Sequence, residues 1–154
     1  MDPVKQFTRN HVEIGDCFTQ AARALRRLVD GAGRLADRII ELETSAEQLR
    51  ACLMRQMEVE RDFEPIVEHV LGCGLDEISD IGPHDEIVLK ALEAYEARIA
   101  AARDAAVEGG DVDRRALVHA FDALVDAYEE HSELEQGFLE SYTSVLFTSA
   151  GATY

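Results

Sequence analysis

The sequence contains no tryptophan, three prolines and three cysteines, and it has no long apolar run. Cys17, Cys52 and Cys73 are odd in number and widely spaced, without a CxxC pair, so they predict neither a disulfide framework nor a zinc site. This cysteine usage favours a reducing compartment. The chain opens without a basic start and apolar segment, and no stretch approaches the roughly 18 apolar residues of a membrane helix. We therefore expect a soluble, unprocessed cytoplasmic protein without a membrane partner.

Positive charge is also scarce. The chain has 15 lysines and arginines against 31 aspartates and glutamates, a formal net charge of -16 at pH 7. Such a field repels phosphate backbones and anionic lipid surfaces, so we expect no nucleic-acid partner. With 47% apolar residues the chain is too hydrophobic for a disordered acidic tail. At this length about 68–70% of the surface is buried on folding, which predicts a single domain over residues 1–154.

Glycine and proline divide the chain at 31–33, 72–83 and 109–110, and the segments between are rich in helix-forming residues. The spacing predicts four helices, at about 4–30, 34–71, 83–107 and 112–145. Pro83 is expected in the first turn of the third helix, and Asp111 or Asp113 as the cap of the fourth. Since short connections join antiparallel neighbours, the sequence predicts an all-α, up-down-up-down antiparallel four-helix bundle.

The apolar stripe of each expected helix also contains polar residues, found by steps of three and four. They are His11 in the first helix, Gln56 and Glu60 in the second, His84 at the start of the third, and His131 and Glu135 in the fourth. Counting from the two short turns places His11 level with Gln56 to within about 5 Å, and His84 level with Glu135. The polar residues are therefore expected to meet inside the bundle.

The two carboxylates need a cation, because burying an ionised glutamate without a partner costs several kcal/mol. None of the arginines falls on the stripes. Three imidazoles at the same level point instead to a metal. Histidines and carboxylates from bundle helices are typical ligands of non-haem iron or manganese, and two bridging carboxylates can hold two ions.

This arrangement resembles the hemerythrin-like (HHE cation-binding) family over nearly the whole chain. The matching residues are His11, Gln56-xxx-Glu60, His84 within HDEI, and His131-xxx-Glu135. The resemblance implies a non-haem di-iron centre, with Glu60 and Glu135 as bridging ligands and His11, His84 and His131 as terminal ligands. The family has a histidine where this chain has Gln56, whose neutral amide is a weaker ligand for Fe(II). Another divalent metal remains an alternative.

The family resemblance implies binding or sensing of O2, NO, peroxide or iron. In oxygen-carrying hemerythrins an additional histidine accompanies the ligand that corresponds to His84. This chain has none there, so the resemblance does not favour reversible oxygen carriage. Tyr128 and Tyr95 are candidates for a ligand or a hydrogen-bond donor beside the centre. Two alternatives stay open: a non-catalytic interaction module with a degenerate site, and a di-iron enzyme that degrades peroxide. The sequence lacks the Glu-xx-His spacing of ferritin-like di-iron enzymes, the CxxCH motif of c-type haem proteins and a glycine-rich phosphate loop. A nucleophilic pair of a cysteine and a histidine stays open as a further alternative.

Overall fold

The computed structural model describes the backbone of residues 3–71 and 76–151, and the side chains of 5–63, 83–137, 139 and 140. Within these ranges the chain forms four α-helices and no strand. The helices are α1 (Pro3–Val29), α2 (Leu35–Leu71), α3 (Asp76–Val107) and α4 (Arg114–Gly151). The all-α prediction is confirmed. Cys73 lies outside the described residues.

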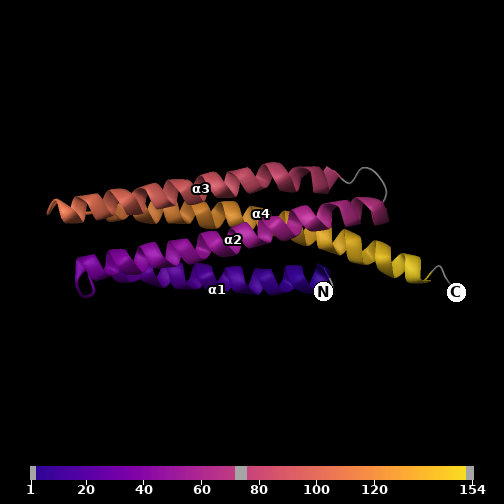
Figure 1. The fold of residues 1–154 in the computed structure, drawn as a ribbon, viewed down its shortest axis with the longest axis horizontal. Coiled ribbons are helices and arrows are strands. Elements are labelled where there is room, and N and C mark those ends of the chain that lie inside the picture. Colours follow the sequence, from indigo (N-terminus) through magenta and orange to yellow (C-terminus); the bar gives the residue numbers. More distant parts are fainter. Residues whose placement is uncertain (1–2, 72–75, 152–154) are drawn as a thin grey trace.

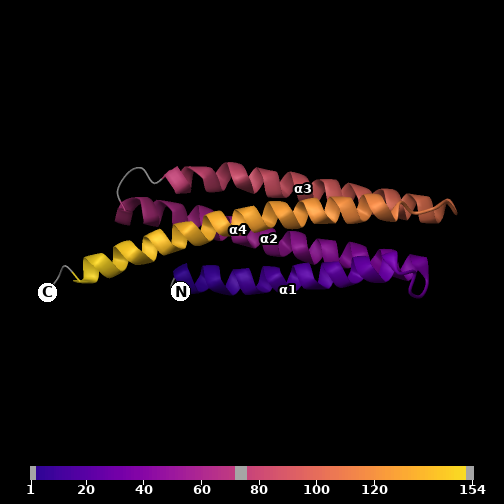
Figure 2. The same cartoon turned by 180° about the vertical axis from the view of Figure 1, so that it is seen from behind.

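The helices lie side by side along one long axis (Figure 1). The chain runs along α1, turns, and returns along α2, and α3 and α4 repeat this path, so successive helices are connected at alternate ends. The most extensive contacts are between α1 and α2 and between α3 and α4, and α2 packs on α3 over a smaller area. The view from behind shows that the last turns of α4 extend past the start of α1 (Figure 2). This arrangement is compatible with a helical bundle.

Both short turns end a helix with a glycine of positive φ. Gly31 has φ 72° and Gly109 has φ 74°, a conformation that costs little without a side chain. In the first turn the N–H of Ala32 donates to the carbonyl of Arg27, and in the second the N–H of Gly110 donates to the carbonyl of Ala105. These bonds span five residues, as in the Schellman motif, and they satisfy carbonyls that the helix end leaves free.

The start of α4 confirms one of the two expected caps. The Asp113 carboxylate accepts a hydrogen bond of 3.0 Å from the backbone N–H of Ala116. This is the N-cap geometry, in which a side-chain oxygen satisfies a free N–H of the first turn. The helix therefore begins at Arg114, two residues after the expected start, and Asp111 is not the cap. It continues to Gly151, beyond the expected end at 145.

The prediction for the start of the third helix is wrong. Helix α3 begins at Asp76 instead of 83, so Pro83 lies inside the helix rather than in its first turn. A proline there removes one backbone hydrogen bond, and this cost made residue 83 look like a boundary. Acidic residues at 76 and 77 favour a helix start because they interact well with the helix dipole.

The core is a continuous apolar cluster that all four helices contribute to. Its largest fully buried side chains are Tyr95, Ile14, Leu28, Leu42, Leu49, Leu53, Leu92, Leu117 and Leu124. Arg50 of α2 binds Glu96 of α3 through two hydrogen bonds, Nε to Oε2 at 2.9 Å and Nη2 to Oε1 at 2.5 Å. This pair ties the two helix hairpins together at the surface. Over the described residues, no helix has an apolar stretch of the length that a membrane crossing requires.

Tyr95 supplies a test of the core packing. Its side chain is fully buried against Phe121, and within the described residues its hydroxyl has no hydrogen-bond partner. Tyr95→Phe should raise the free energy of unfolding by about 1 kcal/mol, because it removes an unsatisfied polar group. The control Leu92→Ala, equally buried, should lower it by about 2–5 kcal/mol. Urea denaturation measures both, and a loss above 1 kcal/mol in Tyr95→Phe would contradict this account.

Candidate metal centre

The polar core residues meet toward the end of the bundle where α1 begins. Helix α2 contributes Gln56 and Glu60, and α4 contributes His131 and Glu135, each pair with i, i+4 spacing on one helix face. All four are buried, from 6% exposed for Glu60 to 0% for Glu135. His11 reaches the same level from α1 with its side chain 25% exposed. The expected levels of His11 and Gln56 agree with their shared contact on Glu135.

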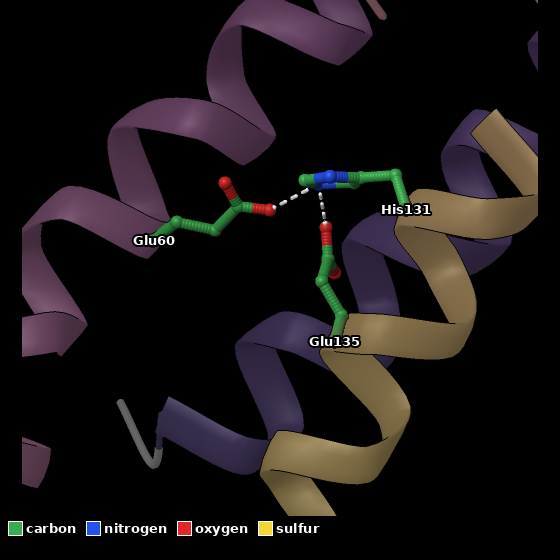
Figure 3. A group of neighbouring side chains, drawn as sticks. All are labelled: Glu60, His131 and Glu135. Atoms are coloured by element: carbon green, nitrogen blue, oxygen red, sulfur yellow. Dashed lines mark hydrogen bonds and ion pairs between the residues drawn. The ribbon is translucent and has the colours of Figure 1, made fainter. Parts of the chain in front are cut away.

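His131 lies at the centre of the cluster, facing the carboxylates of α2 and α4 (Figure 3). Its Nε2 is 2.8 Å from Glu60 Oε1 and 2.5 Å from Glu135 Oε1. The second oxygen of Glu60 is buried and has no hydrogen-bond partner within the described residues. Two buried acids from different helices therefore compete for one imidazole nitrogen.

The other oxygen of Glu135 receives hydrogen bonds from α1 and α2. His11 Nε2 donates to Oε2 at 2.7 Å, and the Gln56 amide nitrogen donates to the same atom at 2.6 Å. Tyr128 donates its hydroxyl to His11 Nδ1 at 3.1 Å, which leaves the ring proton on Nε2. Of the two tyrosines singled out in the sequence, Tyr128 is thus a hydrogen-bond donor beside the cluster. Tyr95 packs on Phe121 further along the bundle.

Asp85 belongs to the cluster but was not predicted from the sequence. Its Oδ1 lies 3.2 Å from His131 Nε2, with the side chain 16% exposed. Asp85 stands next to His84 in α3, one position off the apolar stripe, so a search by steps of three and four passes over it. The sequence offers one signal for Asp85, namely that it is an acidic residue directly after the candidate ligand His84.

His84 lies beside the cluster without joining its oxygens. Its ring stacks on His131 with centroids 5.5 Å apart. Its Nε2 is 3.5 Å from the carboxylate of Glu130, which is 73% exposed, and its Nδ1 is buried without a hydrogen bond to any described residue. Of the six residues predicted from the sequence, five are linked by hydrogen bonds and by the ion pair of His131 with Glu135, and His84 lies against them through ring stacking.

The acids of the cluster have displaced pKa values. Burial raises the pKa of Glu60, and the negative charges of Glu135 and the nearby Asp85 raise it further. Burial also raises the pKa of Asp85. For Glu135 burial acts in the same direction, but hydrogen bonds from His11 and His131 outweigh it and leave its pKa lowered. When no cation is bound, the two shifts together favour a proton on Glu60 and a negative charge on Glu135.

Three of these residues could hold a metal ion. Glu60, His131 and Glu135 each offer one ligand atom, and these atoms lie within 4.8 Å of one another. Carboxylate oxygen together with imidazole nitrogen suits several divalent transition metals. Within the described residues no hydrogen bond or ion pair from a lysine or arginine reaches Glu60, Asp85 or Glu135. A metal ion would supply the positive charge that the cluster lacks.

Comparison of the chain with protein-family models, with curated proteins and with solved structures finds no match in any of the three. The class of protein is therefore inferred from the side chains of the cluster.

The raised pKa of Glu60 predicts how stability depends on pH in metal-free protein. Above its ordinary pKa of 4.5 the folded state keeps a proton that the unfolded state has lost, so stability falls as pH rises. Glu60→Gln removes this dependence while its amide oxygen still accepts from His131. We expect the free energy of unfolding at pH 8 to rise by about 1–3 kcal/mol, with a smaller gain at pH 5.

Chemical denaturation of the chelator-treated protein at the two pH values measures the effect. The control is Glu58→Gln, which changes an exposed acid two residues away on α2 and should alter stability by less than about 0.5 kcal/mol. A Glu60→Gln protein that is less stable than the wild type at pH 8 would show that the ionised carboxylate stabilises the fold.

Proposed function

We propose that this chain is a hemerythrin-like protein with up-down-up-down topology that holds a non-haem iron pair and uses it to bind or sense O2, NO, peroxide or iron. The crowding of carboxylate oxygens at His131 carries the proposal. Three oxygens, from Glu60, Asp85 and Glu135, lie within 3.2 Å of one nitrogen. A neutral imidazole has at most one N–H there, which cannot satisfy three acceptors. Such convergence is the arrangement that ligands adopt around a cation.

The donor set fits iron. Glu60 and Glu135 would bridge two ions, because each carboxylate has one oxygen toward His131 and a second oxygen directed elsewhere. His131 and His11 would bind terminally from α4 and α1. His84 would be the fifth ligand, since its Nδ1 is buried beside His131 without a hydrogen bond to any described residue. Asp85 adds an oxygen donor from α3.

The chain's own residues would tune the centre. With a metal on Nε2 of His11, the ring proton would lie on Nδ1 and would be donated to the Tyr128 oxygen, so Tyr128 would orient the ring. Gln56 donates to Glu135 and would hold that carboxylate in place. A histidine at position 56 would instead bind the metal itself. The α1 and α2 side of the centre would therefore be the more open one. A non-haem iron pair supplies affinity for small diatomic ligands and peroxide when bound.

A second candidate is a non-catalytic interaction module whose polar core no longer binds metal. One observation favours it: His11, Gln56 and His131 hydrogen-bond the two glutamates and so satisfy part of their hydrogen-bonding capacity. A protonated Glu60 would remove part of the charge. The two candidates differ in what happens when the glutamates lose their ability to ionise.

Metal analysis of protein expressed with added iron tests the proposal. We expect about two irons per chain and an oxo-to-iron charge-transfer absorption band. Glu60→Gln together with Glu135→Gln should abolish both, because the amides keep size and hydrogen bonding but lose the charge. Glu58→Gln is the matched control and should keep full iron content. Fewer than about 0.2 irons per chain in the wild type would reject the iron centre, and the absence of any other bound divalent metal would favour the interaction module.

A further inference from the structure

Cys17 and Cys52 face each other across the contact between α1 and α2. Their sulfurs are 2.8 Å apart, and both cysteines are free thiols in the structure. A disulfide bond is about 2.05 Å long, so the sulfurs need to approach by less than about 0.8 Å. The residues are 35 positions apart, and neither lies in the metal cluster. The spacing of cysteines in the sequence does not show which sides of two helices are in contact, so this pair was not predicted.

The surroundings distinguish the two sulfurs. Arg55, one turn along α2 and 62% exposed, donates from Nη2 to Cys52 Sγ at 3.3 Å. Burial, followed by the hydrogen bond to Cys52, raises the pKa of Cys17 to about 12. The Arg55 guanidinium contacts the Cys52 sulfur, and its positive charge stabilises a thiolate at that position. This contact assigns the attacking sulfur to Cys52.

We propose that Cys17 and Cys52 are a reversible dithiol and disulfide pair that joins α1 to α2 when a hydroperoxide oxidises it. The Cys52 thiol releases its proton to water, the thiolate attacks one peroxide oxygen, the O–O bond breaks, and the released oxygen takes up a proton from water and leaves as water or an alcohol. Cys52 is then a sulfenic acid. The Cys17 sulfur attacks the Cys52 sulfur, an S–S bond forms, the S–O bond breaks, and water leaves with the Cys17 proton. Two thiols and one hydroperoxide thus give one disulfide, one water and one alcohol or second water, and an external dithiol reverses the reaction.

The position of the pair gives the crosslink a structural consequence. Cys52 lies one helical turn before Gln56 on α2, and Cys17 lies six residues after His11 on α1. A disulfide would fix the separation of α1 and α2 close to the level where both helices reach Glu135. The inference depends on the two thiols and Arg55, and it stands or falls independently of iron binding.

The test uses the full chain, reduced, freed of reductant and metal, and then treated with a small excess of hydrogen peroxide. The chain has three cysteines, so forming one disulfide should leave one titratable thiol, that of Cys73. Peptide mapping without reduction should find Cys17 linked to Cys52. The midpoint of thermal unfolding should rise by about 5–10 °C and return on addition of dithiothreitol.

The matched controls separate the pair from the third cysteine. Cys73→Ser should still form the crosslink and end with no free thiol, whereas Cys17→Ser and Cys52→Ser should each lose both the crosslink and the thermal shift. Three unreacted thiols, a crosslink between chains only, or sulfinic acid without a Cys17 to Cys52 link would each overturn the proposal.

Arg55 provides a kinetic test of the attacking sulfur. Arg55→Met should slow disulfide formation at pH 7 about 3-fold or more, and Arg55→Lys should restore part of the rate. Arg27→Met, which removes an exposed guanidinium that pairs with Glu41 elsewhere on the α1 and α2 contact, should leave the rate unchanged. Equal rates in Arg55→Met and the wild type would overturn the assignment of Cys52 as the nucleophile.

Discussion

The crowding of three carboxylate oxygens around the Nε2 of His131 is the interaction on which the polar core depends. An ionised carboxylate inside an apolar core costs several kcal/mol unless a partner compensates its charge. Histidines supply at most part of that compensation, and raising the pKa of Glu60 supplies another part by keeping it protonated. A bound divalent cation would supply the whole of it and would release the proton, which couples metal affinity to pH.

Helix geometry explains how residues far apart in the sequence reach one point. The i, i+4 spacing in α2 and α4 places two polar side chains of each helix on the buried face, one turn apart. The two glycine-ended turns fix the levels of α1 with α2 and of α3 with α4. The apolar side chains of the core, Leu53 and Leu124 among them, exclude water and keep the effective dielectric constant low. Electrostatic effects at the cluster are therefore larger than at the surface.

Apolar periodicity was sufficient to predict the four helices and the polar residues on their buried faces, because both follow from local spacing. It misplaced the start of α3, because a proline inside a helix costs one backbone hydrogen bond and Pro83 therefore resembled a helix boundary. It also missed Asp85, because a side chain one residue off the stripe can still reach His131. The contact between Cys17 and Cys52 depends on the rotation of two helices about their axes, which the sequence does not specify.

The most direct test of a di-iron centre is diffraction from crystals of the iron-loaded chain at wavelengths above and below the iron edge. The account predicts two anomalous peaks on the high-energy side that disappear on the low-energy side, bridged by Glu60 and Glu135 and bound by His11, His84 and His131. An electron-density map without such peaks, in which His131 Nε2 still hydrogen-bonds Glu60, would contradict it.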